Sequence, residues 1–166
     1  MAARPVLRLP HPVLTTPSTA IGPVDDEAAA LGRDLVDTMR ASPACVGLAA
    51  PQIGVGRRAF AVDVTGHRKA RSCHGLFVLF DPVVLSAGEV ELGREGCMSV
   101  PDLTGDVARP TSLVVAGTGL LGEAVRLEVD AFEARAVQHE LDHLDGLVFL
   151  DRVRGPHALF ARKVYR

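Results

Sequence analysis

The most constraining feature of this chain is the nine-residue stretch Q-H-E-L-D-H-L-D-G, residues 138–146. It carries His139 and His143 four residues apart, with Glu140 directly after the first histidine. On an α-helix, residues four apart lie on one face, with Cβ atoms roughly 5–6 Å from each other. Both imidazoles can therefore reach one divalent ion, and the carboxylate of Glu140 borders the same face. Two neutral imidazoles and a neighbouring carboxylate are the minimum set for activating water at a metal ion with a general base beside it.

The surrounding residues predict that this helix is buried, rather than a solvated helix that happens to carry two histidines. An apolar row and a second apolar flank cover much of its circumference. These two surfaces are formed by Ala134, Val137, Leu141, Leu144 and Val148, and by Phe132 and Ala136. Burying two imidazoles and a carboxylate without partners is costly, and a bound cation removes that cost. The helix alone therefore favours a metal site.

The composition is that of an ordinary globular protein, and it excludes several classes of partner. With 166 residues, a single domain over the whole chain (1–166) with a full hydrophobic core is expected. A formal net charge of −2 gives no reason to expect nucleic acid or an anionic membrane as a partner. No apolar run approaches the roughly 20 residues of a membrane span, and no signal peptide is recognisable, so a cytoplasmic location is expected.

The remaining elements predict an α+β fold with mostly antiparallel sheets wrapped around the buried central helix. An amphipathic helix is expected from Asp25 to about Ser42, and a short helix at the C-terminus over 156–165. Residues 5–23 should form an extended arm, and residues 102–111 a proline-bounded loop. Alternating or β-branched apolar residues predict strands at 58–64, 75–85, 88–93, 112–118, 124–129 and 147–150.

Two further stretches carry candidate site residues. Residues 45–56 are small and apolar except for Gln52, which must find a hydrogen-bond partner if it is buried. A tight glycine-containing loop explains the same stretch without any function, and both interpretations stay open. Cys97, in E-G-C-M-S-V-P, could be a buried structural thiol, but a helix with two histidines that needs a third ligand favours a metal thiolate.

No fourth ligand is evident in the sequence. His67, Cys73 and His74 lie in a polar connection between two strands and are interpreted as surface groups, and His11 and His157 are interpreted as solvent-facing. Three protein ligands with one exchangeable position are typical of a catalytic centre, whereas a structural zinc domain would need a fourth protein ligand.

Three motifs together resemble those of the peptide deformylase family. They are G-L-A-A-P-Q-I-G (47–54), E-G-C-M-S (95–99) and Q-H-E-L-D-H-L (138–144), in the order and at the spacing of that family. The likeness extends to the proline-rich arm and to D-G-L-V-F-L-D-R after the last motif. The resemblance implies a metal-dependent hydrolase that removes the formyl group from N-terminal formylmethionine of newly made polypeptides and releases formate.

The resemblance also implies a set of ligands and catalytic groups. Cys97, His139 and His143 would hold one divalent ion, with Fe(II) expected and zinc, nickel or cobalt as replacements. Glu140 would act as general base and acid. The side-chain amide of Gln52 and the backbone N–H of Met98 would stabilise the negative charge on the formyl oxygen.

The family pattern further implies how a substrate is held. Val46 and Gly47 would pair with the extended peptide in strand fashion, and Phe132 and Ala136 would line the methionine pocket. Arg109 is the one cation expected to contact the nascent chain. The implied partners are N-formylmethionyl peptides and nascent chains close to the ribosome, with no nucleic-acid motif, no membrane and a monomeric protein.

The sequence departs from the family pattern at Cys45, where glycine is usual, and at Met98, where leucine is more frequent. Two alternatives to deformylation stay open. A metallopeptidase with the H-E-x-x-H motif usually takes its third ligand downstream as His or Glu, whereas the candidate here is the upstream Cys97. A deformylase-like binding protein would keep the metal without turnover, which the presence of Glu140 and Gln52 disfavours.

Overall fold

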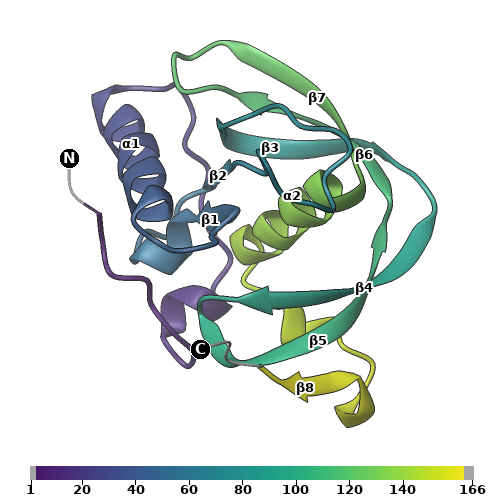
Figure 1. The fold of residues 1–166 in the computed structure, drawn as a ribbon. Coiled ribbons are helices and arrows are strands. Elements are labelled where there is room, and N and C mark those ends of the chain that lie inside the picture. Colours follow the sequence, from purple (N-terminus) through teal and green to yellow (C-terminus); the bar gives the residue numbers. More distant parts are fainter. Residues whose placement is uncertain (1–2, 163–166) are drawn as a thin grey trace.

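A computed structural model of the protein describes residues 3–162 and has the α+β architecture predicted from the sequence. Two antiparallel sheets and two α-helices form its layers (Figure 1). Helix α1 (Asp26–Arg40) packs on one face of the first sheet, and helix α2 (Ala131–Leu144) packs on the other. The second sheet lies on the far side of α2, so that α2 is enclosed between the two sheets. Among the described residues, no helix is both long and apolar enough to cross a membrane.

The first sheet has five strands in the order β1-β2-β3-β6-β7, and all neighbouring strands are antiparallel. Their bounds are Gly47–Ala49, Ala59–Val62, Phe77–Ala87, Ser112–Thr118 and Ala124–Asp130. The middle of this sheet is buried on both faces. Ala61 and Phe80 face α1, whereas Phe60, Val62 and Leu79 face α2. This explains why the sequence here reads as continuous apolar runs.

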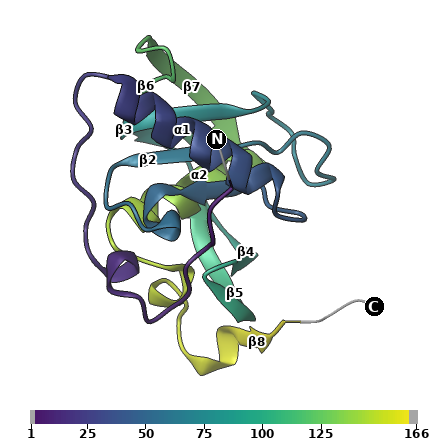
Figure 2. The ribbon, with the colours of Figure 1, turned by 90° about the vertical axis from the view of Figure 1, so that its left-hand side faces the viewer.

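The second sheet has three antiparallel strands in the order β4-β5-β8. Their bounds are Val90–Cys97, Val100–Pro110 and Leu159–Ala161. Strand β4 ends at Cys97, and a tight turn over Met98 and Ser99 leads into β5. Figure 2 shows β4 and β5 on the side of α2 that faces away from β2 and β3. The position of β4 brings Cys97 close to the helix that carries the two histidines.

Helix α1 begins as the sequence predicts. The side chain of Asp25 accepts a hydrogen bond from the backbone N–H of Ala28 at 2.8 Å, and thereby caps the helix. Asp26 and Glu27 in the first turn interact favourably with the helix dipole. The predicted apolar face is buried, with Leu31, Leu35 and Met39 at most 7% exposed.

Helix α2 follows β7 without a loop, because Asp130 is both the last residue of the strand and the N-cap of the helix. Most of the helix is buried, including its polar residues Glu133, Glu140 and His143. A helix of 14 residues with so many buried polar side chains requires specific partners for each of them. Those partners define the site described below.

The predicted loop at 102–111 is wrong, because residues 102–110 belong to strand β5. Gly105, Val107 and Arg109 point inward along β5 at a period of two. The inward-facing row therefore contains a glycine and an arginine instead of three apolar residues. The sequence lacks the alternating apolar pattern by which a strand is recognised. The predicted strand at 88–93 exists, but β4 continues to Cys97.

The predictions for the C-terminal part are also wrong. In place of a strand at 147–150 there is a 3-10 turn, Phe149–Asp151. In place of a terminal helix, a 3-10 turn at Pro156–Ala158 leads into β8, and residues 163–165 of that prediction lie outside the described residues. Strand β8 is stabilised by pairing with Leu103–Gly105, a distant segment that local sequence preferences do not reveal.

Candidate metal centre

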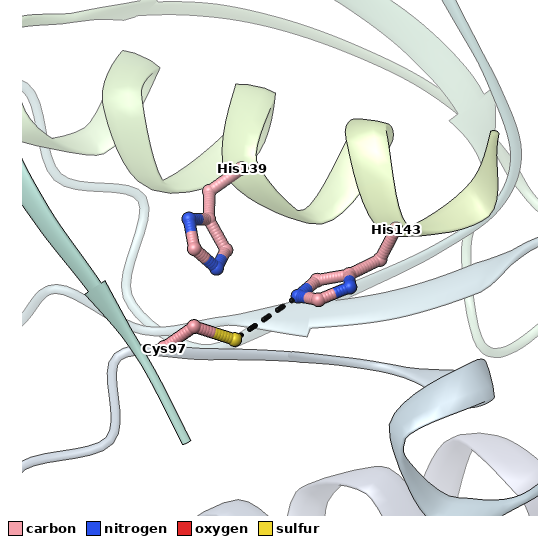
Figure 3. Close-up of side chains that lie close together, drawn as sticks. All are labelled: Cys97, His139 and His143. Carbon is pink, nitrogen blue, oxygen red and sulfur yellow. Dashed lines mark hydrogen bonds between the residues drawn. The ribbon is translucent and has the colours of Figure 1, made fainter. Parts of the chain in front are cut away.

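Helix α2 and strand β4 bring together the three predicted metal ligands. The sulfur of Cys97 and one ring nitrogen each of His139 and His143 lie within 4.8 Å of one another. Figure 3 shows both imidazoles projecting from α2 toward the sulfur, which comes from the end of β4. Cys97 Sγ lies 3.4 Å from Nε2 of His143. This grouping of donor atoms from separate elements is what a single ion requires.

The donors suit a divalent transition metal ion. Cys97 and His143 are almost fully buried, at 5% and 0% exposure, and burial lowers the pKa of His143, so its ring is neutral as a ligand must be. Within residues 3–162, no fourth His, Cys, Asp or Glu joins this group. A thiolate with two imidazoles fits iron, nickel, cobalt or zinc rather than calcium or magnesium.

Glu95 orients the first histidine ligand. Its Oε1 lies 2.9 Å from Nδ1 of His139, which leaves Nε2 of that ring for an ion. Burial would raise the pKa of Glu95, but hydrogen bonds from Arg109 and His139 outweigh it and lower that pKa to about 2. Glu95 is therefore a charged acceptor. The motifs alone assign no role to Glu95, although the strand period of two places it on the same face as Cys97.

Glu140 stands beside the three donors with one oxygen uncommitted. It is only 3% exposed, and its Oε1 makes no hydrogen bond within the described part of the chain. Burial raises the pKa of Glu140 to about 7. A buried carboxylate oxygen without a partner, next to a candidate ion, is positioned to accept a proton from a molecule bound there.

Gln52 has the hydrogen-bond partner that its burial required. It lies in a 3-10 turn, Ala50–Ile53, directly after β1. Its Oε1 accepts a hydrogen bond from the backbone N–H of Ala49 at 3.0 Å, which fixes the orientation of the amide. Its Nε2 donates to Ser99 Oγ at 3.1 Å and to Cys97 Sγ at 3.6 Å. The donor end of Gln52 therefore lies at the candidate metal centre.

A cavity of about 250 Å³, which we call the first cavity, opens next to the donors. Cys97, His139, Glu140 and Gln52 form one wall of it. It is also lined by Met98 and by four of the five residues predicted to contact the substrate, namely Val46, Gly47, Phe132 and Ala136. Three arginines that the sequence analysis did not consider border it as well, Arg94, Arg135 and Arg162.

Arg109 is not available to a substrate, and this expectation must be corrected. It is 4% exposed, and its guanidinium binds Glu95 through Nε and Nη2 at 2.8 and 2.9 Å. Its Nη1 binds Asp142 at 2.6 Å. Arg135 and Arg152 add further bonds to the same two carboxylates. Arg109 thus belongs to a buried ion network under α2 that supports His139 through Glu95.

Two of the histidines interpreted as surface groups, His67 and His74, are at least partly exposed and also make specific contacts. His74 binds the fully buried Glu133 through its ring Nδ1 at 2.7 Å, and its backbone N–H binds the other carboxylate oxygen. The ring of His67 stacks on Phe132 with centroids 3.8 Å apart. Cys73 is exposed, as expected. The sequence holds no spacing signal for these contacts, because they join a loop to a helix nearly 60 residues away.

Fold and site together define a class of α+β protein with a three-donor metal centre, an adjacent buried carboxylate and a substrate-sized cavity. The sequence profile of the polypeptide deformylase family matches residues 3–158. A peptide deformylase of Desulforudis audaxviator is 42% identical over 153 residues, which cover 92% of this chain and 94% of that protein. The chain therefore belongs to the polypeptide deformylase family, a family of metal-dependent enzymes.

Solved structures agree with this assignment. The crystal structure of peptide deformylase from Ehrlichia chaffeensis superposes with a TM-score of 0.86 at 28% identity, covering 91% of this chain and 88% of that one. A peptide deformylase from Synechococcus elongatus, solved in complex with actinonin, gives a TM-score of 0.82 at 33% identity and covers 92% and 80% of the two chains.

Proposed function

We propose that this protein is a hydrolase that removes the formyl group from the N-terminal formylmethionine of newly made polypeptides and releases formate. The observation that carries the proposal is the grouping of the donor atoms of Cys97, His139 and His143 within 4.8 Å of one another, next to a cavity that Cys97 and His139 line together with Glu140 and Gln52. Family membership supports it, and so does the Synechococcus elongatus relative with actinonin bound.

Cys97, His139 and His143 would together hold one divalent ion, with Fe(II) expected and zinc, nickel or cobalt as replacements. Such an ion, when bound, supplies a Lewis acid that acidifies water and polarises a carbonyl oxygen. The sulfur of Cys97 and one ring nitrogen each of His139 and His143, all within 4.8 Å of one another, support this ligand set. Glu95 supports it further, because its hydrogen bond fixes the ring of His139.

Glu140 would accept the proton of the attacking water through its unpartnered Oε1, and would then deliver it to the departing amine. Attack on the formyl carbon places negative charge on the formyl oxygen. Nε2 of Gln52 and the backbone N–H of Met98 would stabilise that charge, because both residues line the cavity next to Cys97. The Ala49 hydrogen bond holds the amide of Gln52 in place and so reduces the cost of reorganising the donor.

The peptide would extend along β1. This strand is at one end of the sheet and, within residues 3–162, pairs only with β2, so its other edge can pair with a peptide at Val46 and Gly47. The methionine side chain would enter the part of the cavity formed by Phe132 and Ala136. Apolar walls of this kind favour an unbranched apolar side chain.

The wider context follows from the same proposal. We expect one catalytic domain over the chain, acting as a monomer in the cytoplasm on nascent chains close to the ribosome. The formyl group is the substrate feature that separates this activity from that of a metallopeptidase.

A direct test compares two substrates with the purified, metal-loaded protein under anaerobic conditions. One is formyl-Met-Ala-Ser, and the other is an acetylated peptide with internal amide bonds and no formyl group. The proposal predicts stoichiometric release of formate from the first and no cleavage of the second. Cleavage of internal amide bonds without release of formate would instead support a metallopeptidase.

A further inference from the structure

A second and larger cavity adjoins the first. It has a volume of about 690 Å³ and lies between the loop that joins β2 to β3, strand β4 and the N-terminal end of α2. The two cavities share Arg94, Phe132 and Arg135 as lining residues, so a chain that leaves the first cavity at this side enters the second. We call the second cavity the basic groove.

The basic groove is rich in positive charge. Five cationic side chains line it: Arg68, Lys69 and Arg71 from the loop, Arg94 from β4 and Arg135 from α2. Only two carboxylates line it, those of Glu91 and Asp130. The chain as a whole has a formal net charge of −2, so this local excess of cations is not a general property of the surface.

The three loop cations are free to bind a ligand. Arg94 pairs with Asp106 at 2.8 Å and Arg135 with Glu95 at 2.9 Å, so those two charges are already compensated. The side chains of Arg68, Lys69 and Arg71 are exposed, and none of them forms an ion pair with a carboxylate in residues 3–162.

The loop is held in a fixed position against α2. The backbone N–H of Ser72 donates to Asp130 Oδ1 and the backbone N–H of Asp130 donates to Ser72 Oγ, both at 2.9 Å. His74 is bound twice by the buried carboxylate of Glu133. Together with the stacking of His67 on Phe132, these contacts anchor the loop on both sides of its cations. Anchoring of the loop backbone lowers the entropic cost of binding, because only the three cationic side chains need to become ordered.

We propose that the basic groove binds acidic side chains of the polypeptide within the first residues after formylmethionine. This inference rests on the proposed function, because the first cavity must hold the formylated end. The loop cations would then make exposed ion pairs with Asp or Glu carboxylates of the substrate. Preference for acidic N-terminal regions would follow as a difference in kcat/KM.

The chemistry of the groove favours a peptide over RNA. Binding of single-stranded nucleic acid uses aromatic side chains on which bases stack. Phe132 is the one aromatic residue that lines the groove, and its ring is already covered by His67 at a centroid distance of 3.8 Å. Carboxylates need only the cations, which remain exposed.

The test uses formylated peptides in which Asp or Asn occupies the second, third or fourth position. kcat/KM is measured at about 20 mM and about 500 mM sodium chloride, between which the Debye length falls from roughly 20 Å to roughly 4 Å. The substrates are compared in wild type, in the triple variant Arg68→Gln/Lys69→Gln/Arg71→Gln, and in the control Arg33→Gln/Arg40→Gln/Arg154→Gln. The control removes the same charge at three exposed positions that do not line the groove.

We expect wild type and control to prefer Asp over Asn at one or more positions by about 3- to 10-fold at low salt, as exposed ion pairs allow. High salt or the groove triple variant should reduce the ratio to about one. The inference is overturned if the ratio of kcat/KM for the Asp peptide to that for the Asn peptide is equal in the groove variant and the control. It is also overturned if wild type shows no preference for Asp at any position. Activity on the neutral peptides distinguishes the two proposals, since an enzyme inactive on all peptides contradicts the proposed function itself.

Discussion

Gly47 packs directly against the carboxylate of Glu140: a Cβ atom at position 47 would lie 2.5 Å from Oε2 of Glu140. Cβ atoms essentially never come within 3.0 Å of another heavy atom, so this position has no room for a methyl group. Gly47 begins β1, and Glu140 lies between the two candidate histidine ligands on α2. The contact therefore fixes the candidate substrate strand and the candidate general base relative to each other.

We predict that Gly47→Ala displaces the carboxylate of Glu140 and lowers kcat about 100-fold, since a misplacement of about 1 Å can cost that much. Metal content should not change, because no ligand is altered. Gly56→Ala is a matched control, because its Cβ would meet its nearest neighbour, Val13, only at 4.0 Å. Equal kcat values for the two variants would show that the contact does not position Glu140.

The substitution Gln52→Glu tests the hydrogen-bond acceptor and the hydrogen-bond donor of the Gln52 side chain separately. A carboxylate oxygen can still accept the Ala49 hydrogen bond, but the donor toward Cys97 and Ser99 is lost. Loss of one such donor costs about 10²–10³-fold in kcat, whereas binding of the peptide should change much less. Steady-state kinetics with formyl-Met-Ala-Ser checks this. A variant that loses affinity (raised KM) at unchanged kcat would exclude Gln52 from charge stabilisation.

Much of the site was predictable from the sequence because its ligands sit on regular elements or in continuous motifs. The spacing of His139 and His143 fixes their shared helix face, and burial of α2 follows from its apolar row. Gln52 was singled out because a lone polar residue among small apolar ones needs a partner. In each case the deciding physics acts within a few residues along the chain.

The basic groove and the buried network were not predictable, because they depend on pairing between distant segments. Arg109 looks like a surface cation in a proline-bounded stretch. It is buried only because β5 pairs with β4 and turns its side chain toward Glu95 and Asp142. Likewise, β8 exists only through its pairing with β5. Local sequence preferences carry no information about either arrangement.

Because Arg109 is buried, we predict that its substitution affects the stability of the fold, and not a contact with the substrate. Arg109→Met should destabilise the fold by about 3–5 kcal/mol, because it leaves buried carboxylates short of a partner. The lower end is expected, since Arg135 and Arg152 still pair with them. Urea unfolding of the metal-free protein measures this loss. Arg126→Met, which breaks the exposed pair with Glu128, should cost at most about 1 kcal/mol. Comparable losses of unfolding free energy in the two variants would contradict a stabilising role of the buried ion network.

Cys45 should react slowly with thiol reagents. Burial, and secondarily the charge of Glu140, raises the pKa of Cys45 to about 11, and its Sγ donates to the carbonyl of Gly47 at 3.2 Å. Because the thiolate is the reactive form, only about 0.1% of this thiol is ionised at pH 8.

Alkylation with iodoacetamide, followed by peptide mass mapping, should therefore label the exposed Cys73 well before Cys45. The rate at Cys45 should rise about tenfold per pH unit between pH 8 and 10. Labelling of Cys45 as fast as Cys73, without this dependence on pH, would contradict the raised pKa of Cys45.

The central claim is that Glu140 moves the proton while Cys97, His139 and His143 hold the ion. The most direct measurement is the rate of formate release from formyl-Met-Ala-Ser by wild type and Glu140→Gln, each with its metal content determined on the same sample. We predict one metal ion per chain in both proteins and a loss of about 10⁴-fold in rate in the variant, at the upper end of general acid–base effects because both proton transfers are lost. Release of formate at the wild-type rate by fully metal-loaded Glu140→Gln would contradict the account.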